Sequence, residues 1–588
     1  MTTMANGFGS LYVGQSGLSG AQNAINVTAN NLSNLNTQGY VREQVLFTDK
    51  EYSTLSEAKM NHLYNQSINM KQSGLGVTVG DVVHTRDIFL DTYFRSESGR
   101  RSFYETCYGT TNEIQELLQE TEGEAFQEVL ADLNESIQEL VKNPGSSVNQ
   151  NLVVQKATLF IERSAALYDS LKEYQLNLNS QIEDKVKRIN EIGKAISEYN
   201  DRIRTVEANH VETAMELRDQ RDLLLDELGS LARITFKEHE DGAVTVKLEA
   251  QEFVDRFTCH QMAVRTDTTT GFETPVWKEL SDFAKEEYVD VFDFTVDISS
   301  ELNTDIGELK AIVMCRGTEV ADFRDITEKS AKEFANTTQL SPVETAEAQL
   351  DSLVRSITTT LNNLFSPLKE VTIDIGTESK TVYVWDEENG TVGAAGERPA
   401  AELFSRRSRP RYTETVDNYG KTWYVYNDEE VGEDQYDLLG QLIPKDTATF
   451  YNILNLEVNK ALTADETRLA TFRQNGEVDH TLADRLSKVF DTDTLELSPE
   501  TPKFSYKNYY DNMVGYVASN GSVYMSVTNT LTSSVSSIEN QRTMVIGVSS
   551  DEELSNMIRF QSAYNAASRF ITTIDEMIEH MIMQLGGR

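Results

Sequence analysis

The chain has 588 residues, with 53 Lys and Arg against 94 Asp and Glu, so its formal charge near neutral pH is −41. A charge of this size repels the phosphates of nucleic acids and anionic lipid headgroups, so neither is an expected partner. No apolar run approaches the roughly 20 residues that a membrane span needs. The length corresponds to about three to five domains, and the presence of only 9 prolines favours long helices.

The N-terminus carries no basic residue before an apolar stretch, unlike a secretory signal peptide. We therefore expect the protein to stay in the cytosol or to leave by a route that uses no cleaved signal.

The first 41 residues contain no charged side chain and no histidine, although 25% of the chain is charged. With charge placed at random, such a gap has odds on the order of one in 10⁵. Apolar residues recur there every seven positions, at Leu11, Leu18, Ile25 and Leu32, and the alternate positions hold Gly14, Ala21, Thr28 and Leu35. This spacing predicts one closely packed face of a helix. Gly39 is suited to end the helix as a left-handed C-cap.

The C-terminal region has a similar and stronger pattern. Apolar positions alternate spacings of three and four at Met557, Phe560, Tyr564, Ala567, Ile571, Ile574, Ile578, Met581 and Leu585. Ser550 and Glu553 are spaced as a capping box at the start of this helix. The two stripes predict that the terminal helices pack together or onto neighbouring subunits, and together they form the candidate assembly interface. An ordinary core helix is the alternative for either stripe.

Between the ends, helical and strand-like periods alternate. The sequence predicts helices near 126–140, 151–206, 211–228 (ending at Gly229) and 344–364, a hairpin at 234–248 with strand-like runs on to about 313, and β-structure at 371–445. The predicted fold is mainly α with inserted β-modules: a long coiled-coil-like helical rod formed with both chain termini, plus outer β-rich domains.

The expected domains follow from these elements. They are an N-terminal axial helix at 1–41 that packs with 530–588, a helical rod domain at 42–230, a β-rich module at 231–340, a rod helix at 341–370, an outer inserted β-module at 371–445, a return of the rod domain at 446–529 and a C-terminal axial helix at 530–588.

Four stretches resemble the axial proteins of the bacterial flagellum. Residues 30–40 (NNLSNLNTQGY) resemble the Asn-rich signature shared by rod, hook and hook-associated proteins, and residues 76–95 (GVTVGDVVHTRDIFLDTYFR) resemble their next shared block. Residues 214–229 (AMELRDQRDLLLDELG) and 547–585 are similar to blocks of one family among them, hook-associated protein 1 of the hook–filament junction.

The resemblance implies a structural adaptor that assembles with itself into a tubular axial segment between hook and filament. It also implies secretion through the flagellar export channel to an extracellular place at the junction. The implied partners are the hook protein, a second hook-associated junction protein and a dedicated cytosolic export chaperone. A hook or rod protein of the same family is the first alternative. An axial scaffold that displays a binding or enzymatic module at 371–445 is the second.

The sequence shows no pattern of residues that predicts chemistry. No histidine pair has metal-ligand spacing, and no HExxH, GxSxG or Walker-type loop is present. Cys107, Cys259 and Cys315 lie far apart and are expected to act as small hydrophobic residues. We therefore expect no catalytic residue, cofactor site or metal site, and no enzymatic activity.

Two charged runs and one aromatic cluster allow more than one interpretation. Arg218, Asp219, Arg221 and Asp222 lie on one predicted helix, where surface ion pairs are the simple interpretation and a buried network needed for folding is the alternative. Arg406, Arg407, Arg409 and Arg411 are expected in a solvated loop, or else at a proteolytic site. Tyr383, Trp385, Trp423, Tyr424 and Tyr426 are expected to form the core of the β-module, or else a ligand platform.

Overall fold

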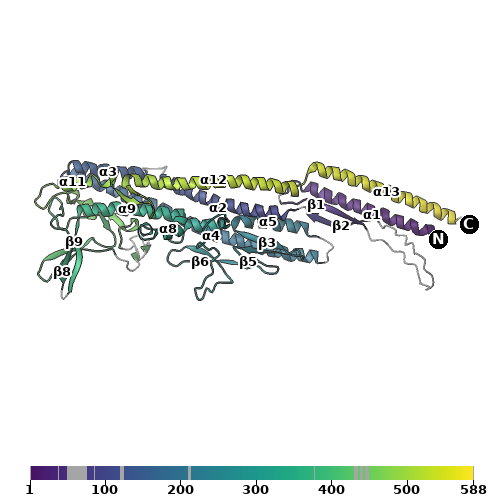
Figure 1. Ribbon diagram of the computed structural model, residues 1–588, viewed down its shortest axis with the longest axis horizontal. Helices are drawn as coiled ribbons and strands as arrows, with labels where there is room; N and C mark the ends of the chain where they lie inside the picture. Colours follow the sequence, from purple (N-terminus) through teal and green to yellow (C-terminus); the bar gives the residue numbers. More distant parts are fainter. Residues whose placement is uncertain are drawn as a thin grey trace. The chain divides into compact units, whose positions relative to one another are not determined.

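The computed structural model describes residues 2–37, 39–49, 76–84, 86–119, 125–208, 213–375, 378–429, 435–436, 442–443 and 449–586. Long helices and several small antiparallel sheets make up these residues (Figure 1), which confirms the predicted class, mainly α with β-modules. The chain forms two compact units. Unit 1 comprises Met1–Arg100, Arg188–Gln261 and Thr530–Arg588, and unit 2 comprises Arg101–Lys187 and Met262–Asn529.

The α-helices are α1 (Thr2–Ser33), α2 (Ile88–Gln119), α3 (Phe126–Lys142), α4 (Ser147–Glu207), α5 (Met215–Leu231), α6 (Glu308–Arg316), α7 (Arg324–Thr327), α8 (Ala331–Asn336), α9 (Pro342–Phe365), α10 (Lys460–Ala464), α11 (His480–Leu486), α12 (Tyr506–Ile546) and α13 (Ser550–Gly586). Four short 3₁₀ turns are η1 (Thr338–Leu340), η2 (Ile453–Asn455), η3 (Glu466–Arg468) and η4 (Val489–Asp491).

The named strands that the structure describes pair in antiparallel fashion. In unit 1, β1 (Glu43–Asp49) pairs with β2 (Val77–His84), and β3 (Ile234–Glu238), β4 (Val244–Leu248) and β5 (Gln251–Val254) form a three-stranded sheet. In unit 2, β11 (Tyr412–Val416), β12 (Thr422–Tyr426), β9 (Glu378–Trp385) and β8 (Leu368–Ile375) form a sheet in that order. The other pairs are β6 (Met262–Thr266) with β7 (Glu273–Trp277), β10 (Phe404–Arg406) with β15 (Leu456–Val458), β13 (Gln435–Tyr436) with β14 (Leu442–Ile443), and β16 (Asp493–Glu496) with β17 (Lys503–Ser505).

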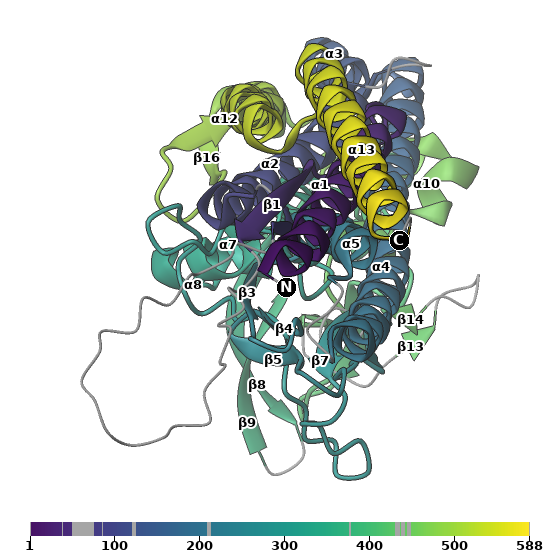
Figure 2. The same cartoon turned by 90° about the vertical axis from the view of Figure 1, so that its right-hand side faces the viewer.

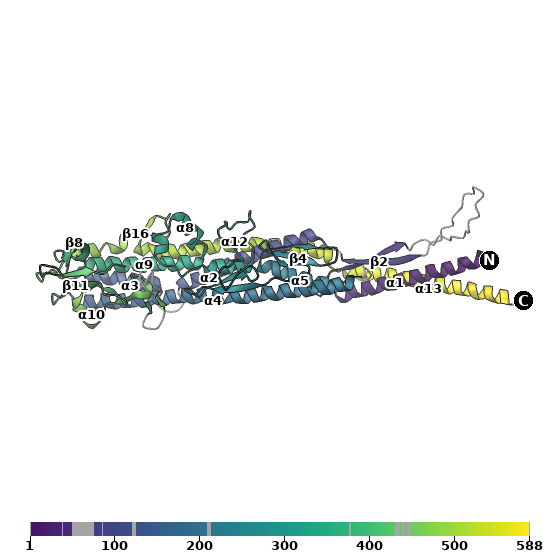
Figure 3. The ribbon, with the colours of Figure 1, turned by 90° about the horizontal axis from the view of Figure 1, so that it is seen from below.

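In unit 1, the first and last helices of the chain run side by side. Helices α1 and α13 are in contact, and Figures 1 and 3 show them side by side, with the start of α1 and the end of α13 at the same end of the pair; Figure 2 shows the pair from that end. The two helices are therefore antiparallel. Strands β1 and β2 lie against α1.

Most of the predicted helices and the hairpin are confirmed. The helices predicted near 126–140, 151–206 and 344–364 correspond to α3, α4 and α9, and the hairpin at 234–248 corresponds to β3 and β4, with Phe236 opposite Val246. The stripe on α4 includes Leu171, Ile182 and Ile196, each 0% exposed. These elements were predictable because their apolar residues follow one period over many positions.

The terminal helices are shorter than the predicted axial segments. Helix α1 ends at Ser33, and Gly39 instead has φ +79° in the turn that follows, where a Cβ atom would lie 2.5 Å from Leu223. The chain between Ile546 and Ser550 is not helical. At Gly547 a Cβ atom would lie 2.3 Å from the carbonyl oxygen of Thr543, so a side chain does not fit there.

Four other expectations are wrong. Helix α5 continues through Gly229 to Leu231, because the absent side chain admits Arg95, 3.0 Å from the place of a Cβ atom. The strand-like run to 313 ends earlier, since Glu308–Arg316 is helix α6.

The other two concern side chains. Arg406 and Arg411 are buried rather than solvated: Arg406 donates to the carbonyls of Thr449 and Asn427. Of the aromatic cluster, only Trp385 is buried, and Tyr383 is 48% exposed.

Unit 2 contains a row of buried carboxylates on α9. Glu344 accepts hydrogen bonds from the backbone N–H groups of Thr318 and Glu319, and Asp351 accepts from Phe323 and Ile453. Burial raises the pKa of Glu344 to about 8 and that of Asp351 to about 7. The row fixes the loop after α6 to the helix.

We expect the free energy of unfolding to rise as the pH falls from about 9 to about 6.5. The folded-state pKa values of Glu344 and Asp351 lie above those of the unfolded chain, near 4. The folded protein therefore binds these protons more tightly, and its stability increases as the pH falls through both values. The melting temperature, measured by calorimetry across this range, checks the sign.

The double substitution Glu344→Gln and Asp351→Asn should flatten this pH dependence. The control is Glu333→Gln, because Glu333 is an exposed cap of α8 whose pKa is lowered by backbone hydrogen bonding and does not titrate in this range. A melting temperature that decreases over the same interval would contradict the assignment.

Candidate assembly interface

Small residues allow α1 and α13 to approach closely. A Cβ atom at Gly14 would lie 2.8 Å from Ile571, and one at Gly17 would lie 3.7 Å from Ala567. The contact at Gly14 leaves no room for a side chain, whereas the contact at Gly17 is an ordinary van der Waals distance. Helix α1, which has no charged residue, therefore packs one face closely against α13.

The predicted interface residues are half-buried in this pair. On α1 they are Leu11, Leu18, Ile25 and Leu32, and on α13 they are Met557, Phe560, Tyr564, Ile571, Ile574, Ile578 and Met581. The side chain of Leu585 is not among those that the structure describes. The structure places Phe560 beside Phe47 of β1, with ring centroids 6.2 Å apart. These residues face the chain's own N-terminal region, and their part in subunit contacts remains a prediction.

A second apolar set on α13 points to solvent. Its members are Leu554, Ile558, Phe570, Met577, Ile582 and Met583, with side chains 44% to 70% exposed. The periodic stripe did not predict these residues because they lie off its regular three-and-four spacing. Apolar residues outside the stripe of an amphipathic helix could have indicated an exposed interaction surface.

Asn31 and Glu553 join the two terminal helices. The Asn31 amide donates to Glu553 at 3.2 Å and to the Glu43 carbonyl at 2.9 Å, and its oxygen accepts from Glu43 N–H and the Tyr40 hydroxyl. Glu553 also binds the Arg42 guanidinium at 2.8 and 2.9 Å. The capping box predicted for Ser550 and Glu553 is therefore wrong, because Glu553 is occupied by Asn31 and Arg42.

The segment after α1 is tied to α5 and to the end of α12. The backbone N–H of Val41 donates to Asp219 at 3.0 Å, and that of Arg42 donates to the Ile546 carbonyl at 2.9 Å. His84 lies 3.4 Å from Asp219. Burial lowers the pKa of His84 to about 4 and raises that of Asp219 to about 7, so the two side chains do not form a full ion pair near neutral pH.

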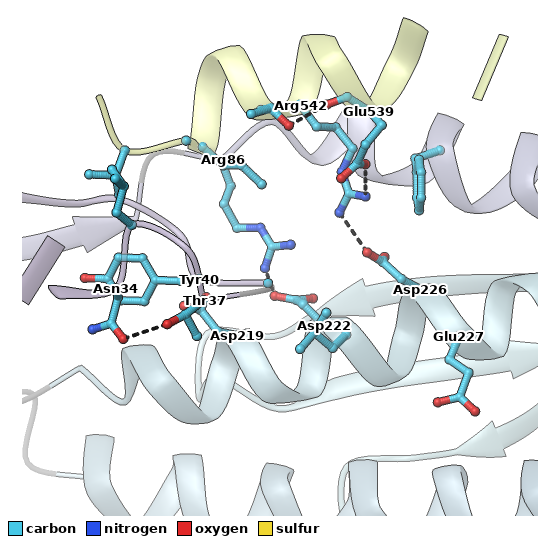
Figure 4. Close-up of a pocket in the computed structure, with 18 residues that line it drawn as sticks. Asn34, Thr37, Tyr40, Arg86, Asp219, Asp222, Asp226, Glu227, Glu539 and Arg542 are labelled. Carbon is cyan, nitrogen blue, oxygen red and sulfur yellow. Dashed lines mark hydrogen bonds and ion pairs between the residues drawn. The ribbon is translucent and has the colours of Figure 1, made fainter. Parts of the chain in front are cut away.

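A buried cluster of ion pairs lies next to these contacts (Figure 4). Asp226 of α5 uses both oxygens, accepting from Arg95 of α2 at 2.6 Å and from Arg542 of α12 at 2.9 Å. Arg542 also binds Asp91 at 2.9 Å, and Arg86 pairs with Asp222. Asp226 thus joins three helices of unit 1, which we call the Asp226 cluster. It lines a pocket of about 560 Å³.

The alternative of a buried network is the correct one for residues 218–222. Asp219 and Arg221 are 5% and 2% exposed. Arg221 donates to Asn200 and to the Gly242 carbonyl, and so fixes the β3–β4 turn to α4. The long-range partners of Arg86, Arg95, Arg542 and Glu553 were not identified from sequence, because they lie far away along the chain.

Among the residues that the structure describes, no group of three His, Cys, Asp or Glu side chains could hold a metal ion. No helix in this described part is long and apolar enough to cross a membrane.

Comparison with known proteins gives matches at both ends and in the middle of the chain. The family described as "Flagellar hook-associated protein FlgK helical domain" matches residues 111–366. "Flagella basal body rod protein" matches residues 11–40, and "Flagellar basal body rod FlgEFG protein C-terminal" matches residues 546–585. Flagellar hook-associated protein 1 of Bacillus subtilis is 24% identical over 593 residues and covers 100% of both chains. The chain is therefore similar to hook-associated protein 1 along its whole length.

Flagellar hook-associated protein 1 of Escherichia coli is 22% identical over 583 residues, which is 96% of this chain and 98% of that protein. The chain is also similar in structure to a protein described as the flagellar hook junction protein FlgK from Burkholderia pseudomallei. That similarity has a TM-score of 0.49 and 12% identity, and covers 77% of this chain and 99% of the other. In this chain, the Asn-rich stretch at 30–40 includes Asn31 and Tyr40, which contact each other and connect α1 to Glu43 and Glu553.

Substituting Asp226 by Ala should destabilise the protein by about 3 kcal/mol, because the buried guanidinium groups of Arg95 and Arg542 would lose a shared carboxylate while keeping Asp222 and Asp91. The matched control is Glu227→Ala at the next position, where an exposed pair with Arg188 contributes about 0–1 kcal/mol. Urea unfolding followed by circular dichroism measures both. Equal losses for the two variants would contradict the role of Asp226.

The α1–α13 contact should be sensitive to side-chain size at Gly14 and not at Gly17. Gly14→Val places atoms where Ile571 lies, so amides of both helices should exchange hydrogen faster. Gly17→Ala fits at 3.7 Å and should stabilise α1 by about 1 kcal/mol through its helix propensity. Hydrogen exchange with mass spectrometry resolves the two helices. Unchanged exchange in Gly14→Val would show that α13 does not pack there.

Proposed function

We infer that this protein is a structural component of the flagellar hook–filament junction. The observation that carries this role is full-length similarity to hook-associated protein 1 together with the joined terminal helices. Rod and hook proteins resemble it over much less of the chain. The hook protein FlgE of Borreliella burgdorferi, for example, is 37% identical over only 92 residues. The rod or hook alternative is therefore weaker than the junction role.

We propose that the apolar stripe of α13 and the exposed apolar residues outside it have different tasks during assembly. The face with Ile571 and Ile574 holds α13 against α1 within one chain, where Gly14 admits Ile571. Ile558, Met577 and Ile582 lie outside this stripe on different sides of the helix, are 58% to 64% exposed, and contact neighbouring copies. Exposed apolar patches on a helix are typical of interaction surfaces. The twelve predicted interface residues would then shape the building block, and the exposed residues outside the stripe would join the blocks.

The partners follow from the same role. We propose that the protein contacts the hook protein on one side and a second hook-associated junction protein on the other, and that it leaves the cell through the flagellar export channel. A cytosolic chaperone would cover the apolar residues of α13 before export. We assign no catalytic activity to the chain.

Deleting the gene should leave cells with hooks that carry no filaments and shed flagellin into the medium. Electron microscopy and analysis of the medium check this outcome. Loss of the hooks themselves would favour a rod or hook protein instead.

Ile558→Asp should abolish filament attachment while leaving the isolated protein folded. A charge at an exposed position costs little in the monomer, but burying it in a subunit contact costs several kcal/mol. The matched control is Ser555→Asp, which adds the same charge at an exposed polar position of α13. Complementation of the deletion strain, scored by swimming and microscopy, measures the effect.

Ile574→Asp tests the predicted apolar stripe of α13. It should also block assembly, and it should additionally speed hydrogen exchange in α1 and α13, because Ile574 is half-buried within the chain. Normal swimming with Ile558→Asp would contradict the proposal that the exposed apolar residues of α13 contact neighbouring copies. Normal swimming with Ile574→Asp would contradict the role of the predicted stripe.

A further inference from the structure

Two of the three cysteine side chains are in contact inside unit 2. Cys107 lies in α2 and Cys315 in α6, separated by 208 positions in the chain, and their Sγ atoms are 3.7 Å apart. Both residues are 0% exposed. Their distance in the sequence gave no indication of this contact. The fold therefore creates a dithiol pair that the sequence analysis treated as unrelated hydrophobic residues.

We propose that Cys107 and Cys315 form a disulfide bond in the folded protein. A disulfide places two sulfurs about 2.05 Å apart, so the observed Sγ atoms need to approach by under about 2 Å. Rotation of either side chain about its Cα–Cβ bond moves the sulfur by such a distance without moving the helix. The surrounding backbone is fixed: the Thr111 hydroxyl donates to the Cys107 carbonyl at 3.0 Å, and the Ser341 hydroxyl donates to the Cys315 carbonyl at 2.6 Å.

The environment of the sulfurs decides when the bond forms. Burial raises the pKa of the Cys107 thiol, and the thiolate is the species that reacts. Tyr104 and Tyr524 lie close by, and their own pKa values are raised by burial first and by the nearby cysteines as well. The folded dithiol is therefore shielded from oxidants, so the bond forms while the chain folds. That the chain folds outside the cell, in an oxidising environment, rests on the proposed function.

The reaction needs a small-molecule disulfide as the oxidant. One cysteine thiolate attacks this disulfide, releases one small thiol and leaves a mixed disulfide on the protein. The second cysteine thiolate then attacks the protein sulfur of that mixed disulfide. The Cys107–Cys315 bond forms, a second small thiol leaves, and the two protons from the cysteines end on the two small thiols. The protein loses two electrons, and the small disulfide gains them.

The bond would tie α2 to α6 across a closed loop of more than 200 residues. Cross-links that close long loops restrict the unfolded chain most. Helix α6 precedes the loop that the α9 carboxylates hold, so a covalent tie at Cys315 would fix the same region from its other side. We expect the oxidised protein to melt about 5 °C or more above the reduced protein.

The test uses the full chain and oxidised glutathione as the probe. The protein is unfolded in reductant and refolded with a mixture of oxidised and reduced glutathione until its circular dichroism matches the starting material. It is then denatured, alkylated with iodoacetamide and digested for mass spectrometry. The expected result is a linked pair of peptides containing Cys107 and Cys315, with Cys259 alkylated. Alkylation of both Cys107 and Cys315 would overturn the proposal.

Two further measurements make the result independent of refolding yield. The same alkylation is applied directly to protein collected from culture medium, where the linked pair is again expected. Cys259→Ser should keep the linked pair and the higher melting temperature of the oxidised form, whereas Cys107→Ser should lose both. An oxidised form that melts no higher than the reduced form would overturn the stabilising bond. Because the refolding arm involves no export, its failure would leave the junction role untouched.

Discussion

A buried carboxylate, that of Glu553, connects the two ends of this chain. It is 2% exposed and binds Arg42 and Asn31, both of which belong to the N-terminal region. Removing one member of such a group leaves charge without a partner away from water, which costs more than the contact itself provides. The pairing of α1 with α13 depends on this connection, because few side chains of the two helices are fully buried. Among the described side chains of α13, Glu553 is the buried one.

Part of the unusual composition of the N-terminal region follows from the same contacts. The face of α1 that packs on a second helix and on two strands has no site where a charge would be compensated, and it carries none. Its polar residues are used where the chain turns back: Asn31 has each of its hydrogen-bonding groups occupied by Glu43, Tyr40 or Glu553. The Asp226 cluster likewise joins segments that are distant in sequence, where α2, α5 and α12 of unit 1 meet. Together these contacts bring both ends of the polypeptide into one building block of an axial structure.

The periodic elements could be predicted from sequence, and the partners of charged residues could not. The stripe on α4 and the hairpin around Asp241 and Gly242 repeat a local pattern, so a single stretch of sequence contains the necessary information. Asp226 and Arg542 are separated by 316 positions, and no local pattern connects them. For Arg406 and Arg411 the prediction from sequence was wrong in another way, because it placed two buried side chains in solvent. A basic run in an acidic chain indicated a solvated loop, yet the backbone carbonyls of Thr449 and Asn427 accept from Arg406 inside unit 2. Burial of an arginine depends on such acceptors, which only the fold brings together.

The connection at Glu553 can be measured with a double-mutant cycle. Arg42→Met, Glu553→Gln and the double variant are compared with the unmodified protein by urea unfolding, and hydrogen exchange in α1 and α13 is followed in parallel. Because Arg42 and Glu553 touch in a buried site, we expect a coupling free energy of about 1.5–3 kcal/mol and faster exchange in both helices for each single variant. A coupling near zero, with exchange in α13 unchanged, would contradict the claim that this carboxylate holds the two ends of the chain together.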